Sequence, residues 1–398
     1  MAEPEKKPEL HKGLVGVYVD DSKVSKIVQE TNSLTYRGYA VQDLCETCKF
    51  EEVAYLMWHG ELPNKAELVD FEKTERSLRK IDAGLVGVLK ALRHDAHPMD
   101  VLRTAVSYLG AQDSEWSDQS AEGNLKKSID MMAKLPTIVA AWSRIRKGEE
   151  PIEPRADLSY SENFFHMTTG NVPEKEVVAA FDKSMILYAE HSFNVSTFTA
   201  RTITSSLSDI YSAVTGAIGS LKGPLHGGAN EAVLDIINEI KTPEKAQAWL
   251  DDALAQKKKI MGFGHRVYRS GDSRVPTLKK AFNEVAKLRG NEDIGKIMDV
   301  LEKGMLDKKN IKPNVDFPAA GLYHLMGIEQ DMYTPLFVMA RITGWTAHVM
   351  EQLEDNKLIR PLCTYSGEAQ RAVTPLDQRG AAVLPPAGQD KKPGAPKP

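Results

Sequence analysis

Two histidines in glycine-rich segments have the surroundings that acid–base chemistry needs. His226 lies in GPLHGGAN (residues 223–230), where a Gly-Pro break and a Gly-Gly pair predict a tight turn at a helix start. A helix N-terminus lowers the pKa of a histidine and favours the neutral imidazole, which donates a hydrogen bond. His265 lies in MGFGHRVYR (residues 261–269), again after glycines.

Arginines and one aspartate complete this set. Three arginines follow His265 by position 274, and guanidinium groups bind carboxylates and phosphates through paired hydrogen bonds. Asp316 stands in PNVDFP (residues 313–318) between apolar residues and prolines, where desolvation raises a carboxyl pKa and makes a better base. Each segment alone has an ordinary explanation as a turn or a cap. Together they suit proton abstraction beside a carbonyl group in anionic substrates.

Other patterns argue less strongly for chemistry. Cys45 and Cys48 have redox or zinc spacing, but Cys363 is the only further cysteine, and a zinc site uses about four ligands. The pair His94 and His97 has metal-ligand spacing, yet the proline that follows favours a helix start.

Phosphate-binding and nucleophile motifs are equally sparse. The basic run at residues 257–259 is either a solvated helix face or part of a phosphate site before the glycine loop. Residues 262–267 lack the third glycine of a dinucleotide loop, and the sequence has neither a Walker loop nor a Gly-x-Ser-x-Gly nucleophile segment.

The composition is that of a globular protein of 398 residues, with 42% hydrophobic and 27% charged residues. A net charge of −4 gives no general argument for binding nucleic acid or a membrane surface. No stretch is apolar enough to predict a transmembrane helix, and the charged residues 1–12 do not resemble a signal peptide. With only three cysteines, we expect a cytoplasmic protein.

The elements that must position these side chains are mostly helices. Short stretches rich in Val, Leu and Tyr, at residues 14–19 and 34–41, predict a few short strands or extended pieces. We expect an all-α body, because no strand–helix alternation suggests a parallel sheet. The proline-rich residues 381–398 predict a disordered tail. Apolar spacing predicts helices over residues 51–58, 66–81, 177–188, 203–221, 231–240 and 335–349.

The three segments resemble the catalytic segments of citrate synthases. Only the first dozen residues and the tail after about residue 370 fall outside the likeness. The patterns at residues 97–100 (HPMD) and 344–348 (GWTAH) are similar to the bacterial 2-methylcitrate synthase branch, whose members often accept acetyl-CoA as well as propionyl-CoA. Further matching segments are residues 36–39, 50–54, 188–198, 343–348 and 359–361.

This resemblance implies the citrate synthase fold, an all-α homodimer with two domains in each subunit. The large domain would comprise residues 1–227 and 329–380, and a smaller inserted helical domain, residues 228–328, would close over the substrates.

The implied reaction condenses propionyl-CoA, acetyl-CoA or both with oxaloacetate and water, giving 2-methylcitrate or citrate plus CoA. Asp316 would remove the α-proton, His226 would hydrogen-bond the thioester oxygen, and His265 would polarise and protonate the oxaloacetate carbonyl. The resemblance implies no tightly bound cofactor and no metal.

It also implies two sets of binding residues. The substrate ligands would be Arg76, His191, Arg274, Arg341 and Arg360, with Arg360 reaching into the partner's site. CoA would lie along Ile260, Met261, Gly262, Phe263 and Gly264, with Arg269 and Lys312 near its phosphates. His324 and His348 are interpreted as structural. Phe317 and Pro318 differ from many citrate synthases at the acyl pocket.

Two alternatives stay open at this point. One is a dedicated citrate synthase of the tricarboxylic acid cycle, since one methylene contributes only about 1–3 kcal/mol of discrimination. The other is a non-catalytic helical dimer that binds ligands. A citrate-cleaving enzyme is disfavoured because no ATP-binding loop is present.

Overall fold

The computed structural model describes residues 9–265, 267–268 and 270–379, and the chain forms two compact units. One unit joins Met1–Val17 with Arg360–Pro398, and the other is Tyr18–Ile359. The first contains the short 3-10 helices η1 (Lys12–Leu14) and η3 (Leu376–Gln378). The predicted tail at residues 381–398 lies outside the described residues.

A small antiparallel sheet stands near the start of the second unit. Its strands are β1 (Ser25–Val28), β2 (Ser33–Tyr36) and β3 (Tyr39–Ala40), in that order. The prediction of a strand within residues 34–41 is therefore confirmed. Residues 14–19 do not form a strand, because that stretch has no neighbouring strand to share hydrogen bonds with, so of the two predicted alternatives the strand is wrong there.

Helices make up most of the described chain, as the sequence predicts. Their bounds are α1 (Val41–Thr47), α2 (Phe50–His59), α3 (Lys65–Leu78), α4 (Ala83–Ala91), α5 (Pro98–Gln112), α6 (Ala121–Ile145), α7 (Tyr160–Thr169), α8 (Lys175–Tyr188), α9 (Val195–Ser205), α10 (Ile210–Leu221), α11 (Ala229–Ile240), α12 (Pro243–Ala255), α13 (Val275–Arg289), α14 (Asp293–Lys309), α15 (Asp316–Leu325) and α16 (Tyr333–Glu354), with the 3-10 helix η2 (Gln330–Met332) before the last.

The single helix predicted over residues 203–221 is wrong, because the chain turns between α9 and α10. The Asp209 carboxylate accepts hydrogen bonds from the backbone N–H and the hydroxyl of Ser212, at 2.9 and 2.7 Å. Leu207 adopts a left-handed φ of 63°. A capping aspartate begins a new helix, and apolar spacing that continues through the turn conceals it.

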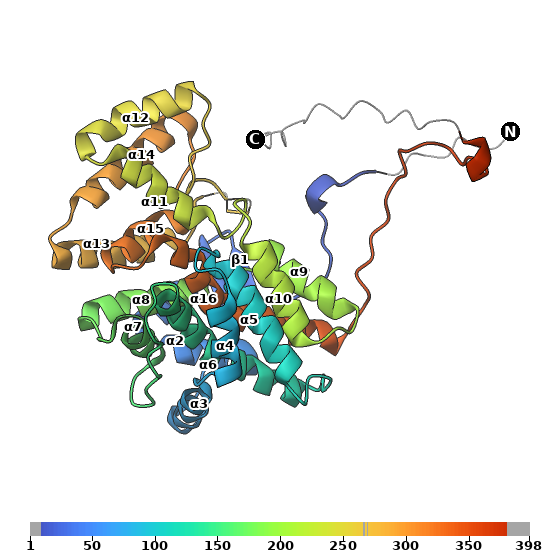
Figure 1. The fold of residues 1–398 in the computed structure, drawn as a ribbon. Coiled ribbons are helices and arrows are strands. Elements are labelled where there is room, and N and C mark those ends of the chain that lie inside the picture. Colours follow the sequence, from blue (N-terminus) through green and yellow to red (C-terminus); the bar gives the residue numbers. More distant parts are fainter. Residues whose placement is uncertain (1–8, 266, 269, 380–398) are drawn as a thin grey trace. The chain divides into compact units, whose positions relative to one another are not determined.

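Helix α16 forms the centre of the second unit. It packs against α2, α5, α6, α8, α9, α10 and α11, and Figure 1 shows it surrounded by them. Nearly all of its side chains are buried, including Trp345 at 0% exposure. A helix that is buried on all sides is a rigid base for the side chains it carries, of which Arg341 is one.

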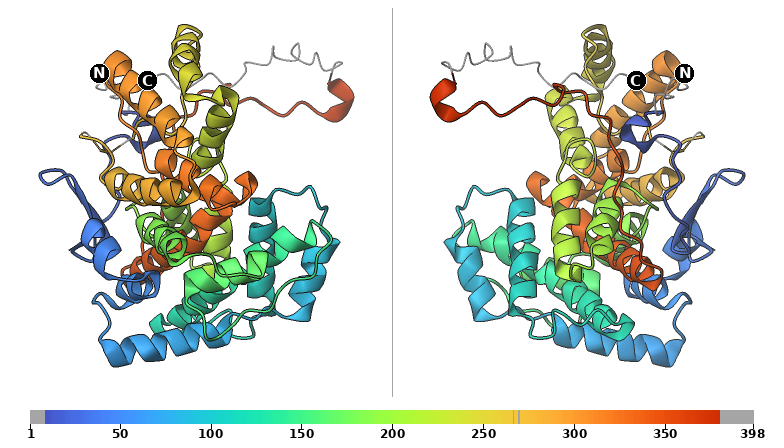
Figure 2. Two further views of the ribbon diagram at one scale, coloured as in Figure 1. Left: turned by 90° about the vertical axis from the view of Figure 1, so that its left-hand side faces the viewer. Right: turned by 90° about the vertical axis from the view of Figure 1, so that its right-hand side faces the viewer.

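Helices α11 to α15 pack largely on one another. α11 contacts α12, α14 and α15, and α13 contacts α15, while α13 also touches α8. The views in Figures 1 and 2 show this group at the opposite end of the unit from α3. This grouping supports a separate small domain at residues 228–328, but the compact units divide elsewhere, so that boundary stays a prediction.

No helix in the described part of the chain is long and apolar enough to cross a membrane.

Candidate active site

Two loops from the small helical group are joined so that Asp316 stands beside the glycine-rich segment. The N–H of Gly264 donates to the Lys312 carbonyl, and the N–H of Asn314 donates to the Gly262 carbonyl, both at 2.9 Å. Asn314 Nδ2 adds a bond of 3.0 Å to the Gly264 carbonyl. This pairing ends where α15 begins, so Asp316 is the first residue of a helix rather than part of a loop.

The Asp316 carboxylate is buried, with 9% exposure. Tyr188, the last residue of α8, donates its hydroxyl to Asp316 Oδ1 at 2.7 Å. Burial raises the pKa of Asp316 to about 6, although the Tyr188 hydrogen bond and the positive charge of Arg274 both act to lower it. A carboxylate of this kind is ionised at neutral pH and is a stronger base than an exposed one.

His226 lies in the turn between α10 and α11. Its Nε2 accepts a hydrogen bond from the backbone N–H of Ser196 at 3.3 Å and lies 2.8 Å from the Ser196 hydroxyl. A backbone N–H only donates, so Nε2 is the acceptor and the proton of the neutral ring is on Nδ1. Burial lowers the pKa of His226 to about 3, assisted by the charge of Arg341. The ring is therefore neutral, as the sequence predicts, and it presents one N–H donor.

His265 has the opposite tautomer. Its Nδ1 accepts backbone N–H groups from Val267 and Tyr268, at 3.1 and 3.4 Å, which leaves the proton on Nε2. Burial and the neighbouring charge of Arg274 lower its pKa to about 4. The ring lies 4.8 Å from that of His191, centroid to centroid. A neutral Nε2–H near a second imidazole is a suitable donor to a carbonyl oxygen.

Two buried polar atoms beside these histidines have no hydrogen-bond partner among the residues that the structure describes. They are Nε2 of His191 and Nη2 of Arg341. Arg341 donates its Nε to the Tyr188 carbonyl at 2.7 Å, and its guanidinium lies over the Phe337 ring at 4.7 Å. Burial lowers the pKa of Arg341 to about 10, so it remains charged at neutral pH. Unpaired buried donors of this kind are costly unless an anionic ligand accepts from them.

Arg274 lies beside the same cluster, at the cap of α13, and has an internal partner. Its Nε and Nη2 donate to the two Asp272 oxygens at 2.9 and 2.7 Å. Burial acts to raise the pKa of Asp272, but the charge of Arg274 and the hydrogen bonds that Arg274 donates together lower it. Asp272 also accepts the N–H of Val315 at 3.0 Å, next to Asp316. This pair therefore links the His265 loop to the start of α15.

The predicted CoA segment contains two glycines with left-handed backbones. Gly262 and Gly264 both have a φ of 82°, a conformation that favours glycine. A Cβ at Gly262 would lie 2.6 Å from Val233 and 3.0 Å from Phe317, so the backbone needs a glycine there for space as well. Lys312 donates its Nζ to the Ser270 carbonyl at 2.8 Å. Arg269 lies outside the described residues.

Two predicted substrate ligands lie on other parts of the chain than this cluster. Arg76 lies on α3 and pairs with Glu72 at 2.9 Å, and α3 is at the far end of the unit from α11 to α15 (Figures 1 and 2). The role of Arg76 as a substrate ligand therefore stays a prediction. Arg360 belongs to the other compact unit, so its relation to the cluster stays a prediction.

Several side chains of the site were not identified from sequence. Tyr188 and Ser196 lie in the matched segment 188–198, and Asp272 follows the His265 loop. Their positions in the sequence therefore pointed to the site, but no role was assigned to them. Trp345 donates its Nε1–H to the Ser196 hydroxyl at 3.0 Å. His348, interpreted as structural, is fully buried, and its Nε2 lies 2.8 Å from the carboxylate of Glu190. Glu190 directly precedes His191 in the chain.

The weaker motifs behave as ordinary structure. Cys45 and Cys48 are free thiols, and burial raises the pKa of Cys45. Residues 257–259 are exposed after the end of α12. His97 caps α5, so the helix start predicted at Pro98 is confirmed. Among the described residues, no group of three or more His, Cys, Asp or Glu is arranged to hold a metal ion.

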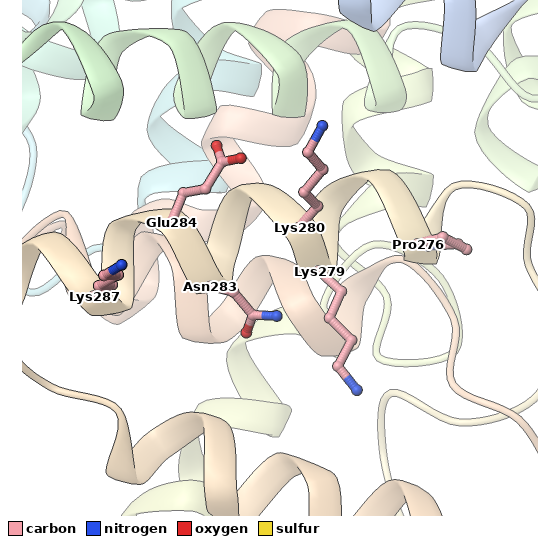
Figure 3. Close-up of a pocket in the computed structure, with 6 residues that line it drawn as sticks. All are labelled: Pro276, Lys279, Lys280, Asn283, Glu284 and Lys287. Carbon is pink, nitrogen blue, oxygen red and sulfur yellow. The ribbon is translucent and has the colours of Figure 1, made fainter.

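Two surface hollows in the described part of the chain contain none of the residues of the cluster. One, of about 470 Å³, runs along a single face of α13, and Figure 3 shows its lining side chains projecting from that one helix. Another, of about 490 Å³, lies between α5, α10 and the loop that carries Trp116. Neither hollow contains a residue predicted for catalysis or binding. We therefore define the candidate site by the hydrogen bonds among Asp316, His226, His265 and their neighbours.

Comparison with known proteins agrees with this geometry. The family model described as "Citrate synthase, C-terminal domain" matches residues 13–362. The citrate synthase of Mycolicibacterium smegmatis is 57% identical over 366 residues, which is 92% of this chain and 97% of that protein. A 2-methylcitrate synthase of Mycobacterium tuberculosis is 55% identical over 369 residues, 93% of each chain.

Solved structures give the same result for the fold. Citrate synthase from Thermotoga maritima superposes with a TM-score of 0.84 at 38% identity, covering 94% of this chain and all of that one. A ternary complex of carboxymethyl coenzyme A and oxaloacetate with citrate synthase from Thermoplasma acidophilum gives 0.88 at 31% identity, covering 93% and 100%. The predicted fold is confirmed. The chain belongs to the citrate synthase family and is an enzyme of the citrate synthase or 2-methylcitrate synthase type.

Proposed function

We propose that this chain condenses a short acyl-CoA thioester with oxaloacetate and then hydrolyses the product thioester to release CoA. The observation that carries the proposal is a buried carboxylate, Asp316, associated with two neutral imidazoles of opposite tautomer. Asp316 and His226 share neighbours, since Tyr188 binds Asp316 and both Tyr188 and His226 lie against the Phe337 ring.

The first step uses Asp316 and His226. The carboxylate of Asp316 takes the α-proton of the acyl group, and the carbanion that forms delocalises onto the thioester oxygen. The Nδ1–H of His226 donates to that oxygen while Ser196 holds Nε2. One preorganised donor to a developing oxyanion contributes about 3–4 kcal/mol, which makes a weakly acidic thioester accessible to a carboxylate base.

The second step uses His265. The Nε2–H polarises the oxaloacetate carbonyl as the new carbon–carbon bond forms, and the resulting alkoxide takes that proton. The imidazolate that is left regains a proton from the water molecule that hydrolyses the thioester. The backbone N–H groups on Nδ1 keep the ring in this tautomer, and its lowered pKa keeps it a neutral donor. Hydrolysis of the citryl-type thioester then releases CoA.

Recognition of the oxaloacetate dianion falls to buried cations and donors. Nη2 of Arg341 and Nε2 of His191 are unpaired and available to a carboxylate, and Arg274 supplies further positive charge. CoA would follow the segment from Ile260 to Gly264, near Lys312 and Arg269.

For the acyl group, we propose that propionyl-CoA and acetyl-CoA are both substrates. The relatives named above carry either activity in their names at 57% and 55% identity. Phe317, which differs from many citrate synthases, packs its ring 4.6 Å from that of Phe263 and adjoins the base, so it is positioned to shape the acyl pocket. An exclusive citrate synthase is the other candidate.

The proposal includes a cytoplasmic homodimer in which Arg360 reaches the partner's site. Free thiols at all three cysteines support the compartment. Equilibrium sedimentation tests the dimer. A dimer whose Arg360→Ala variant retains normal turnover would contradict the role of Arg360.

Thiol release from acetyl-CoA and from propionyl-CoA, each with oxaloacetate, tests the function. We expect release with both, and Asp316→Ala should abolish it while leaving the folded helical content unchanged. A strong preference for acetyl-CoA alone would favour the dedicated citrate synthase. Binding of oxaloacetate without any thiol release would support a non-catalytic binding dimer instead.

A further inference from the structure

The turn that carries His226 has little packing of its own. Leu225, beside His226, is 72% exposed, and the following helix α11 begins without a side-chain cap. Within the turn, the His226 N–H donates to the Gly223 carbonyl and the Gly227 N–H to the Leu221 carbonyl. The position of the imidazole therefore depends on the contacts at the two ends of the turn as well as on Ser196.

Both ends are held by the first turn of α5. At the start of the His226 turn, Lys222 donates to the Asp100 carboxylate at 2.6 Å. At its far end, Glu231 lies 3.4 Å from Nε2 of His97. Nδ1 of His97 accepts the Met99 N–H at 3.1 Å, so the neutral ring carries its proton on Nε2 and donates to Glu231.

Helix α16 completes the attachment at Glu231. The backbone N–H and the hydroxyl of Thr334 both donate to Glu231 Oε1. Gln330 donates to the Glu231 carbonyl and to the Asp235 carboxylate, both at 2.7 Å. The carboxylate of Glu231 is therefore fixed between α5 and the central helix, next to the turn.

We propose that His97 and Asp100 are positioning residues, which hold the His226 turn through Glu231 and Lys222 and so set the imidazole against Ser196. This inference rests on the proposed function and extends it to the HPMD segment at residues 97–100, which has no assigned role in the reaction. Neither residue needs to touch substrate. A displacement of about 1 Å at a catalytic group reduces rate on the order of 100-fold, so loss of one anchor gives a kcat decrease of about tenfold or more.

The variants separate positioning from folding. Asp100→Ala and Lys222→Met each remove one anchor. His97→Asn keeps an acceptor that caps α5 but does not reach Glu231, because asparagine is a preferred N-cap and is shorter. Arg103→Gln is the matched control, since Arg103 pairs with the same Asp100 carboxylate at 3.0 Å but has no hydrogen bond or ion pair with the turn in the described part of the chain.

The experiment measures kcat, the Kd for oxaloacetate, and the isotope effect on kcat with acetyl-CoA deuterated at the methyl group. Misplacement of His226 slows proton abstraction, so anchor variants show lower kcat and a larger isotope effect with an unchanged Kd. The reversed pair, Asp100→Lys with Lys222→Asp, recovers most of the rate. Arg103→Gln matches the unmodified enzyme.

Wild-type kcat in the anchor variants overturns the inference. So does a lower kcat with an unchanged isotope effect, because that pattern means fewer folded molecules. Absence of turnover in the unmodified enzyme is a different outcome, since it rejects the proposed function itself.

Discussion

Removal of the Tyr188 hydroxyl is the most direct test of Asp316 as the base. In the native site, the hydroxyl donates to the carboxylate at 2.7 Å and stabilises its ionised form. The pKa of Asp316 is nonetheless raised to about 6 by burial. Tyr188→Phe removes a donor without removing the ring, so the pKa of Asp316 must rise further.

The size of this effect follows from the hydrogen bond. A bond to a charged group contributes about 1.5–3 kcal/mol, and one pH unit corresponds to about 1.4 kcal/mol, so the pKa should increase by about 1–2 pH units. A base acts in its deprotonated form, and activity therefore appears as pH rises through its pKa. The acid limb of the kcat/KM profile should move to higher pH by that amount.

Thiol release measured from pH 5 to pH 9 gives the profile, and kcat/KM reports the free enzyme. Tyr323→Phe is a matched control, because this buried tyrosine is close enough to Asp316 to interact electrostatically but donates to Ser184, at 3.0 Å. Its acid limb should stay in place. An unchanged or lowered acid limb in Tyr188→Phe would refute the assignment of Asp316 as the titrating base.

Three further predictions concern the same site. Asp316→Asn should abolish turnover but raise the free energy of unfolding at pH 8 by up to about 3 kcal/mol. The pKa of Asp316 is about 6 in the folded state and 3.8 for the exposed group, so ionisation of Asp316 destabilises the folded state. That gain should shrink as pH falls below 6, where the native carboxyl is protonated; denaturant unfolding at pH 5 and pH 8 measures it, and equal stabilities at pH 8 would contradict it. Ser196→Ala should reduce kcat about 2- to 13-fold with an unchanged Kd for oxaloacetate, because His226 Nε2 loses the neighbouring hydroxyl, at about 0.5–1.5 kcal/mol, but keeps the backbone N–H donor; an increased Kd would argue against this role. Gly262→Ala should raise KM for acyl-CoA far more than Gly264→Ala, since both have a φ of 82° but only Gly262 lacks space for a Cβ, and equal effects would mean that backbone strain alone matters.

The sequence alone predicted the helical class and most of the helices. Apolar spacing and helix caps depend on residues only a few positions apart, so both can be recognised directly in the sequence. Pro98 and the capping His97 began α5 as expected. The same locality explains the error at Asp209, where a cap interrupts an apolar pattern that continues on both sides.

The sequence also identified the residue types that the reaction needs. Histidines after glycines and an aspartate among apolar residues are unusual combinations. The glycines and prolines in these segments predict tight turns of the backbone. The neutral state of His226 was predicted from a helix start, whereas burial is the larger cause in the structure.

Only the tertiary structure decided how these groups work together. Tyr188 reaches Asp316 across 128 positions, and Trp345 reaches Ser196 across 149, so no local pattern contains either contact. The tautomers of the two histidines depend on which backbone N–H groups approach each ring. Burial, which sets their pKa values and leaves Arg341 with an unpaired donor, is a property of packed helices, because desolvation requires atoms from distant segments to surround the group.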